Sequence, residues 1–140
     1  MSKKKVLFVC IHNSARSQMA EAYLNKLGGG RYAAESAGLE PGKLNPLVVQ
    51  VLKEDGIDIS KKGTQGVMNL LKQGRKFDLV VTVCDGASGE RCPFFPGQSE
   101  RQHWEFPDPS SFQGTAAEKL AFTRKVRDEI KAKVLDLIKS

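Results

Sequence analysis

Cys10 and Arg16, near the start of the chain, are spaced as the two reactive ends of an anion-binding loop. An apolar strand-like run, 6–9, precedes Cys10, and apolar residues recur at helical spacing from about Arg16 to Leu27. The turn between them directs backbone N–H groups and the positive end of the helix dipole at one point. The Arg16 guanidinium adds a bidentate fork that suits a tetrahedral oxyanion. These positive groups favour the thiolate form of Cys10, so the pattern predicts a nucleophile that attacks a bound oxyanion.

The predicted oxyanion-binding loop consists of Ile11, His12, Asn13, Ser14, Ala15, Arg16 and Ser17. Asn13 tolerates left-handed backbone geometry, and Ser14 or Ser17 could donate a hydrogen bond to the Cys10 thiolate. Capping of the following helix is the plainer role for the same polar side chains, and both roles can hold at once. We expect no proton transfer by His12.

Asp108 lies between two prolines, Pro107 and Pro109, just after the last predicted strand. A carboxylic acid held over an oxyanion site could protonate a leaving oxygen or hydroxide. An aspartate that precedes a proline is also a common turn former. The residues alone leave both roles open.

Two further cysteines suggest redox chemistry. Cys84 directly follows the strongest strand signal, 79–83, and Cys92 follows a polar, glycine-containing stretch, 85–91. A zinc site is not expected, because paired ligand spacings are missing and the two histidines lie far from other candidate ligands. A flexible stretch between two thiols suits thiol–disulfide exchange, since the sulfurs must approach within bonding distance. Two structural free cysteines are the alternative.

Strand and helix patterns alternate along the chain. The expected strands cover about 6–9, 32–37, 79–83 and 103–105, and the expected helices cover about 16–27, 46–55, 65–72 and 116–138. This alternation implies a parallel sheet with helices on both faces, in which ligands bind at the carboxyl ends of the strands. Cys10, Cys84 and the segment after Trp104 should therefore share one edge of the sheet.

The composition is typical of a small globular enzyme. The chain has 140 residues, and we expect a single domain over 1–140. The net charge is +6, but the lysines are spread along the chain and alternate with acids, which argues against nucleic-acid binding. No apolar stretch is long enough to cross a membrane, and the lysines at the start of the chain do not introduce a signal peptide. We expect a cytoplasmic, monomeric enzyme.

With these residues in view, the chain resembles the arsenate reductases built on the low-molecular-weight protein tyrosine phosphatase fold. The resemblance covers nearly the whole chain and rests on segments 6–10, 12–21, 36–38, 58–60, 78–84, 103–104, 108–109 and 126–130. It implies an α/β fold of three layers, with a four-stranded parallel sheet in the order 2-1-3-4 and helices on both faces.

The resemblance also implies a three-cysteine cascade that reduces arsenate to arsenite and so detoxifies it. The Cys10 thiolate attacks arsenic, and Asp108 helps a hydroxide to leave as water. Cys84 then attacks Cys10 and releases arsenite, and Cys92 attacks Cys84 to leave a Cys84–Cys92 disulfide. Thioredoxin, or a similar donor such as glutaredoxin, reduces this disulfide. No metal or organic redox cofactor is required.

Some relatives of this kind bind a potassium ion near the anion loop. Asn13, Glu21 and Ser36 match the positions used there. Gln65 stands where those relatives have a carboxylate. The sequence thus matches the potassium site at three positions and departs from it at one.

Two other functions are compatible with the same loop. A low-molecular-weight tyrosine phosphatase would need only Cys10, Arg16 and Asp108, and could hydrolyse phosphotyrosine through a phosphocysteine. Such phosphatases carry aromatic residues after the Asp-Pro pair, where this chain has Ser110-Ser111, with Phe112 and Trp104 the nearest aromatic substitutes. A regulatory module that senses an oxyanion would leave the three thiols without a use. The reductase is therefore favoured, with weak phosphatase activity as a side reaction.

Overall fold

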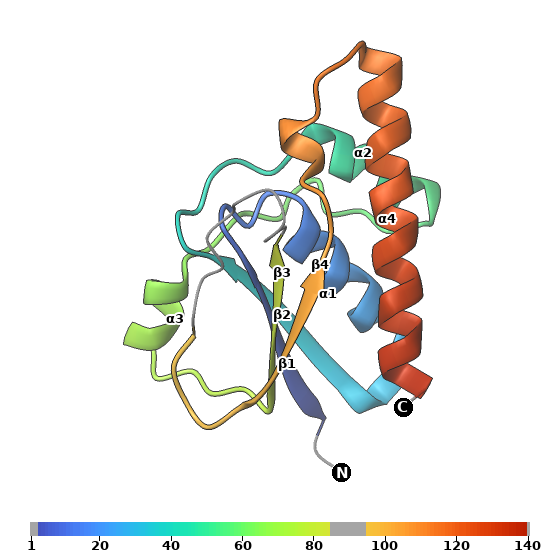
Figure 1. Cartoon of the computed structure of the whole chain (residues 1–140). Coiled ribbons are helices and arrows are strands. Elements are labelled where there is room, and N and C mark those ends of the chain that lie inside the picture. Colours follow the sequence, from blue (N-terminus) through green and yellow to red (C-terminus); the bar gives the residue numbers. More distant parts are fainter. Residues whose placement is uncertain (1–2, 85–94, 140) are drawn as a thin grey trace.

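The computed structural model describes residues 3–84 and 95–139 of the chain. Its strands are β1 (Lys4–Cys10), β2 (Tyr32–Gly38), β3 (Leu79–Cys84) and β4 (Glu100–Glu105), and its α-helices are α1 (Arg16–Leu27), α2 (Pro46–Glu54), α3 (Val67–Lys72) and α4 (Ala116–Lys139). Two short 3-10 turns, η1 (Gly29–Arg31) and η3 (Pro109–Ser111), were not predicted from the sequence. Figure 1 shows that the elements form one α/β sandwich.

The four strands form a single parallel sheet in the order β2-β1-β3-β4, which confirms the predicted topology. β1 occupies a central position, with Cys10 opposite Gly38 of β2 and Val9 opposite Thr82 of β3. The ends of β1 and β3 therefore lie side by side at the carboxyl edge of the sheet, as was predicted for Cys10 and Cys84.

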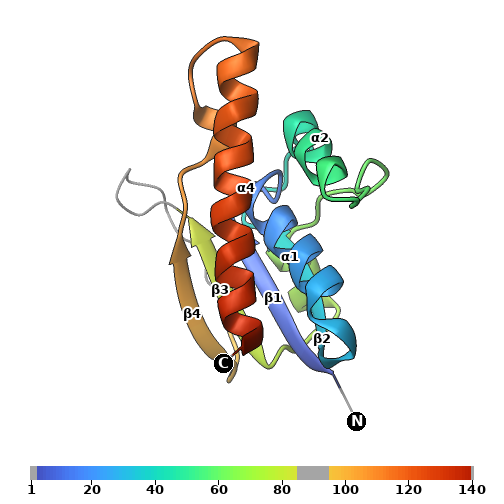
Figure 2. The ribbon, with the colours of Figure 1, turned by 90° about the vertical axis from the view of Figure 1, so that its right-hand side faces the viewer.

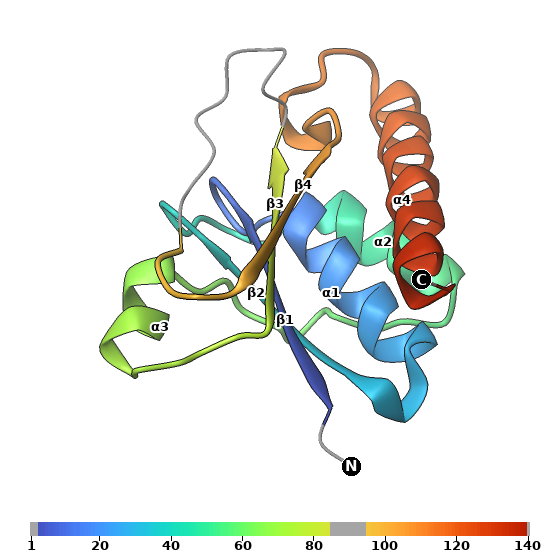
Figure 3. The same ribbon diagram turned by 60° about the horizontal axis from the view of Figure 1, so that its bottom comes forward.

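Helices cover both faces of the sheet, as expected. α1, α2 and α4 lie on one face and the short α3 lies on the other (Figures 1 and 3). The long α4 runs beside α1, as the turned view in Figure 2 shows. Side chains of β1 alternate between the faces, so that Phe8 joins the large cluster with Met19 and Ile130, and Val9 joins the smaller cluster with Leu70.

The helix boundaries follow local sequence signals at two places. The side chain of Asn45 accepts a hydrogen bond from the N–H of Leu47, and Pro46 occupies the first turn of α2. Before α4, Thr115 and Glu118 form a capping box, with reciprocal bonds of 2.9 and 3.1 Å. Within the described ranges, no helix is long and apolar enough to span a membrane.

α1 and α4 each show one detail that helical spacing alone does not give. α1 has no side-chain cap, because its N-cap residue is Ala15, and the hydroxyl of Ser17 inside the helix lies 2.9 Å from Cys10 Sγ. In α4, Val126, Ile130 and Val134 are fully buried at four-residue spacing, and Leu137, one residue before the next such position, completes the buried stripe. The stripe shifts because a straight helix turns slightly more than once in four residues.

An ion-pair network joins α2 to α4. Glu54 accepts hydrogen bonds from Arg124 at 2.7 and 3.0 Å and from Arg127 at 2.7 Å. The hydrogen bonds from Arg124, which have the larger effect, and from Arg127 lower the pKa of Glu54 to about 2. The carboxylate is therefore stabilised in the folded protein relative to the unfolded chain.

We expect the contribution of this network to stability to be complete above pH 4.5, the ordinary pKa of glutamate, and to disappear as the pH falls toward 2. Glu54→Gln should melt below the wild type near neutral pH, and the two melting temperatures should converge at about pH 2. Melting curves across this range check the prediction. Glu129→Gln, at an exposed position of α4, is the control and should show no such convergence. A difference in melting temperature between wild type and Glu54→Gln that stays constant down to pH 2 would contradict the prediction.

Candidate active site

The loop between β1 and α1 is fixed by hydrogen bonds that hold its carbonyl groups outward. Each carbonyl from Cys10 to Ala15 accepts a bond of 2.7–3.1 Å, in order from Leu39 N, Glu40 N, Gly42 N, Gln18 Nε2, Asn45 N and Met19 N. Because these carbonyls are all bonded to other segments, we infer that the N–H groups of the loop face its interior, as the N–H of Asn13 does toward Cys10 Sγ. Such a concave arrangement of N–H groups at a helix N-terminus binds anions.

Cys10 lies at the centre of this loop, with its side chain buried and its thiol free. The N–H of Asn13 donates to Cys10 Sγ at 3.0 Å, and Ser17 Oγ lies 2.9 Å from the same sulfur. Because Ser17 Oγ already accepts a bond from Asn13 Nδ2 at 2.8 Å, its own proton is available for the sulfur. Two donors therefore stabilise a thiolate at Cys10. Asn13 has the left-handed φ of 56° that the sequence suggested it could adopt.

Arg16 and Asp108 both line the cavity at Cys10. Arg16 is buried, and its Nη1 donates to the carbonyl of Phe106 at 3.0 Å, while its Nη2 lies 3.8 Å from Asp108 Oδ2. Asp108 Oδ1 accepts a bond of 2.9 Å from the N–H of Ser110 and so caps η3. One carboxylate oxygen thus forms the turn and the other faces the site, which makes both predicted roles of Asp108 compatible.

A small cavity is enclosed by these groups. Its lining consists of Cys10, His12, Ser14, Ala15, Arg16 and Asp108. His12 is exposed at the rim, where its Nδ1 lies 3.0 Å from the carbonyl oxygen of Glu40. The cavity places a nucleophile, a guanidinium and a carboxyl group around one point, as required for displacement at a tetrahedral oxyanion.

Cys84 ends β3 and is fully buried and disulfide-bonded. Val83 faces the same hydrophobic cluster as Phe8 and Cys10, so strand alternation directs Cys84 to the opposite face of the sheet. Cys92, the third predicted site residue, lies outside the described residues. The structure thus brings Cys10, Arg16 and Asp108 together and places Cys84 at the end of the neighbouring strand.

Residues 5–140 match the family described as low molecular weight phosphotyrosine protein phosphatase. This chain belongs to that family. An arsenate reductase from Halalkalibacterium halodurans is 46% identical over 130 residues, which cover 93% of this chain and 91% of that protein. The resemblance stated from the sequence is confirmed.

Solved structures place the chain near the reductases of this family. One described as an arsenate reductase in the phosphate binding state is 34% identical, with a TM-score of 0.80 and 97% of each chain covered. A thioredoxin-dependent arsenate reductase from Corynebacterium glutamicum is 28% identical, with a TM-score of 0.70, and covers 98% of this chain and 61% of that one.

The aromatic side chains near the site are engaged elsewhere in the fold. Trp104 is buried in the core against Phe8 and Phe106. Phe112 stacks on Phe122 of α4, with ring centroids 4.4 Å apart and planes 8° apart. Trp104 is therefore part of the core, and one face of the half-buried Phe112 is covered by Phe122.

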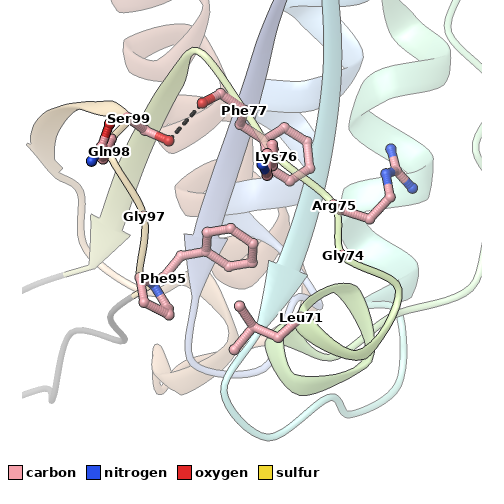
Figure 4. A pocket seen from close by; sticks show the side chains of 10 residues that line it. Leu71, Gly74, Arg75, Lys76, Phe77, Phe95, Gly97, Gln98 and Ser99 are labelled. Atoms are coloured by element: carbon pink, nitrogen blue, oxygen red, sulfur yellow. Dashed lines mark hydrogen bonds between the residues drawn. The ribbon is translucent and has the colours of Figure 1, made fainter.

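A larger pocket, of about 490 Å³, lies away from the loop (Figure 4). It is lined by Leu71, Phe77 and Phe95, with Arg75 and Lys76 beside them. Phe77 precedes β3, whereas Cys10 ends β1, so this pocket lies toward the opposite edge of the sheet. Its described lining residues include no cysteine, and the hydroxyl of Ser99 donates to the carbonyl of Phe77. The small cavity at Cys10 is therefore the candidate active site of this family member.

Sequence reasoning missed the glycine that supports the loop. A Cβ on Gly38 would lie 2.8 Å from both Asn13 N and Ile11 O, which are backbone atoms that cannot yield without moving the loop. We expect Gly38→Ala to lower the free energy of unfolding by about 1–3 kcal/mol and to weaken oxyanion binding. Thermal melting and phosphate titration check this.

Gly42→Ala is the matched control for Gly38→Ala, because its Cβ would meet only His12 Cβ at an ordinary 3.7 Å. It should leave both measurements near their wild-type values. Equal effects of the two substitutions would show that the close approach at Gly38 does not shape the loop.

Proposed function

We propose that this protein reduces arsenate to arsenite through its cysteines and that thioredoxin regenerates it in the cytoplasm. The observation that carries the proposal is the Cys10 sulfur held by two donors inside an oxyanion cavity, together with an oxidised Cys84 at the next strand end. The arsenate reductases among the relatives and solved structures support the choice of arsenate.

In the first step, the Cys10 thiolate attacks arsenic while Arg16 and the loop N–H groups bind the arsenate oxygens. A hydroxide leaves as water with a proton from Asp108, which faces the cavity beside Arg16. The product is a Cys10–arsenate thioester in which arsenic is still pentavalent.

In the second step, a Cys84 thiolate attacks Cys10 Sγ. The S–As bond breaks, its electron pair reduces arsenic to the trivalent state, and arsenite leaves behind a Cys10–Cys84 disulfide. Cys84 must first turn from the opposite face of the sheet, which requires it to leave its register position opposite Glu105 at the end of β4. The end of β3 is therefore the part of the described fold that we expect to move.

In the last steps, Cys92 attacks Cys84, and a dithiol donor reduces the resulting disulfide. A free Cys10 beside an oxidised Cys84 is the thiol distribution that this cascade leaves before the donor acts. Thioredoxin is the proposed donor, because the similar protein from Corynebacterium glutamicum is described as thioredoxin-dependent. Two electrons pass from the cysteine thiols to arsenic and leave a disulfide on the protein, so the proposal includes no redox cofactor.

A side-by-side assay tests the proposal. The protein is supplied with thioredoxin, thioredoxin reductase and NADPH, and NADPH consumption with arsenate is compared with hydrolysis of a phenyl phosphate by the same preparation. We expect rapid arsenate-dependent NADPH consumption and only slow hydrolysis. Fast hydrolysis without arsenate-dependent NADPH consumption would instead support the phosphatase.

A further inference from the structure

A buried polar cluster lies behind the oxyanion loop and includes residues of the loop itself, α1 and β2. Its members, none more than 8% exposed, are Asn13, Ser17, Gln18, Glu21 and Ser36. Glu21 is the only member that carries a charge. A carboxylate in such a position requires an opposite charge and hydrogen-bond donors to offset its desolvation.

Lys62 supplies that charge. Its Nζ lies 2.8 Å from Glu21 Oε1 and 2.8 Å from Gln18 Oε1. The hydroxyl of Ser36 donates to the same Glu21 oxygen at 2.6 Å. The ammonium therefore lies between a buried carboxylate and a buried amide, although its residue is more than 40 positions away from both in the sequence.

The residues matched to the potassium site of related reductases do not fit a potassium ion in this arrangement. Asn13 Oδ1 accepts bonds from Gln65 N at 3.0 Å and Gln18 Nε2 at 3.2 Å, and Gln65 Nε2 donates to Ser36 O at 2.8 Å. A potassium ion needs several oxygen atoms in place of its hydration shell. Here protein donors take these oxygens, and an ammonium already lies on the carboxylate.

The ammonium also fixes the orientation of Gln18. An ammonium has donors and no acceptor, so it binds the oxygen of the Gln18 amide and leaves the NH₂ group facing Asn13. Gln18 Nε2 then donates to the carbonyl of Asn13 at 3.0 Å, and the N–H of Asn13 donates to Cys10 Sγ. A continuous series of hydrogen bonds thus connects Lys62 to the sulfur.

We propose that the Lys62 ammonium acts as a built-in cation in place of potassium, and that it positions Gln18 and Asn13 so that the loop presents an N–H to Cys10. Lys62 is a positioning residue, since it contacts neither the sulfur nor the oxyanion cavity in the described contacts. Only the activity measurement in the test below depends on the proposed reduction of arsenate.

The experiment compares wild type with Lys62→Met, which keeps an unbranched side chain one atom shorter than lysine and removes its charge. Melting temperature, affinity for inorganic phosphate and arsenate reduction are measured at equal ionic strength in KCl, NaCl and tetramethylammonium chloride. We expect the wild type to behave alike in all three salts. In tetramethylammonium, Lys62→Met should melt about 5 °C lower and should lose about tenfold or more in kcat/KM.

The decisive expectation is that KCl restores part of each loss in Lys62→Met, because removal of the ammonium opens a place for a cation beside Glu21. Lys61→Met, at the exposed neighbouring position, is the matched control and should resemble wild type in every salt. The double variant Lys62→Met/Glu21→Gln should lose the response to KCl, because the carboxylate that attracts the cation is gone.

Two outcomes would overturn the proposal. One is a wild type whose melting temperature or phosphate affinity rises selectively in KCl, which would mean that potassium binds with Lys62 present. The other is a Lys62→Met variant that KCl does not improve in any of the three measurements. If the salt pattern appears in melting and phosphate binding while arsenate is not reduced, the Lys62 inference stands and the proposed function fails.

Discussion

Cys10→Ser is expected to abolish arsenate reduction, lowering kcat by at least about 10⁴-fold. A serine hydroxyl is not ionised near neutral pH, and it cannot form the disulfide whose formation supplies two electrons to arsenic. The loss should be measured with purified protein in the coupled thioredoxin assay and with direct detection of arsenite.

The same variant should keep its fold and its anion site. The serine oxygen can accept the N–H of Asn13 and pair with Ser17 as the sulfur does, so melting temperature and phosphate affinity should stay close to those of wild type. This separates loss of the nucleophile from loss of the loop. Arsenite production by Cys10→Ser within about tenfold of the wild-type rate would exclude Cys10 as the nucleophile.

Cys92→Ser is expected to complete one turnover and then stop. Cys10 and Cys84 are intact in this variant, so one arsenite should be released per protein and a Cys10–Cys84 disulfide should accumulate. Without Cys92 the disulfide is not transferred onward, and thioredoxin should fail to restore activity. A burst of arsenite followed by a flat trace, with mass spectrometry of the cross-linked peptides, checks the prediction.

Cys84→Ser is the matched comparison for Cys92→Ser. It removes the thiol that attacks Cys10, so we expect neither the burst of arsenite nor the intramolecular disulfide. Sustained turnover of Cys92→Ser with thioredoxin at the wild-type rate would mean that Cys92 is not the last thiol of the relay.

Much of the fold follows from short-range signals. The run 79–83 has the apolar, β-branched character of a strand covered on both faces, and it became β3 at the centre of the sheet. Thr115 and Glu118 mark the start of α4 because both partners of the capping box lie within one turn. The strand order came from the resemblance to a known family rather than from periodicity.

The parts of the site that sequence reasoning missed depend on long-range contacts. Lys62 reaches Glu21 across 41 residues, and no local pattern distinguishes it from its exposed neighbour Lys61. Gly38 matters because β2 brings it against the loop, which is a property of the register. The sequence left open whether Ser14 or Ser17 contacts the sulfur or caps α1, and only the folded loop selects the contact between Ser17 and Cys10.

The central claim, that the cysteines of this chain supply the electrons that reduce arsenic, is tested most directly by a single-turnover stoichiometry on the fully reduced wild-type protein. The protein is mixed with excess arsenate in the absence of any other thiol, and arsenite and remaining free thiols are both counted. Our account predicts one arsenite released and two thiols lost per protein molecule. If all three thiols are retained and no arsenite is released, the account is contradicted.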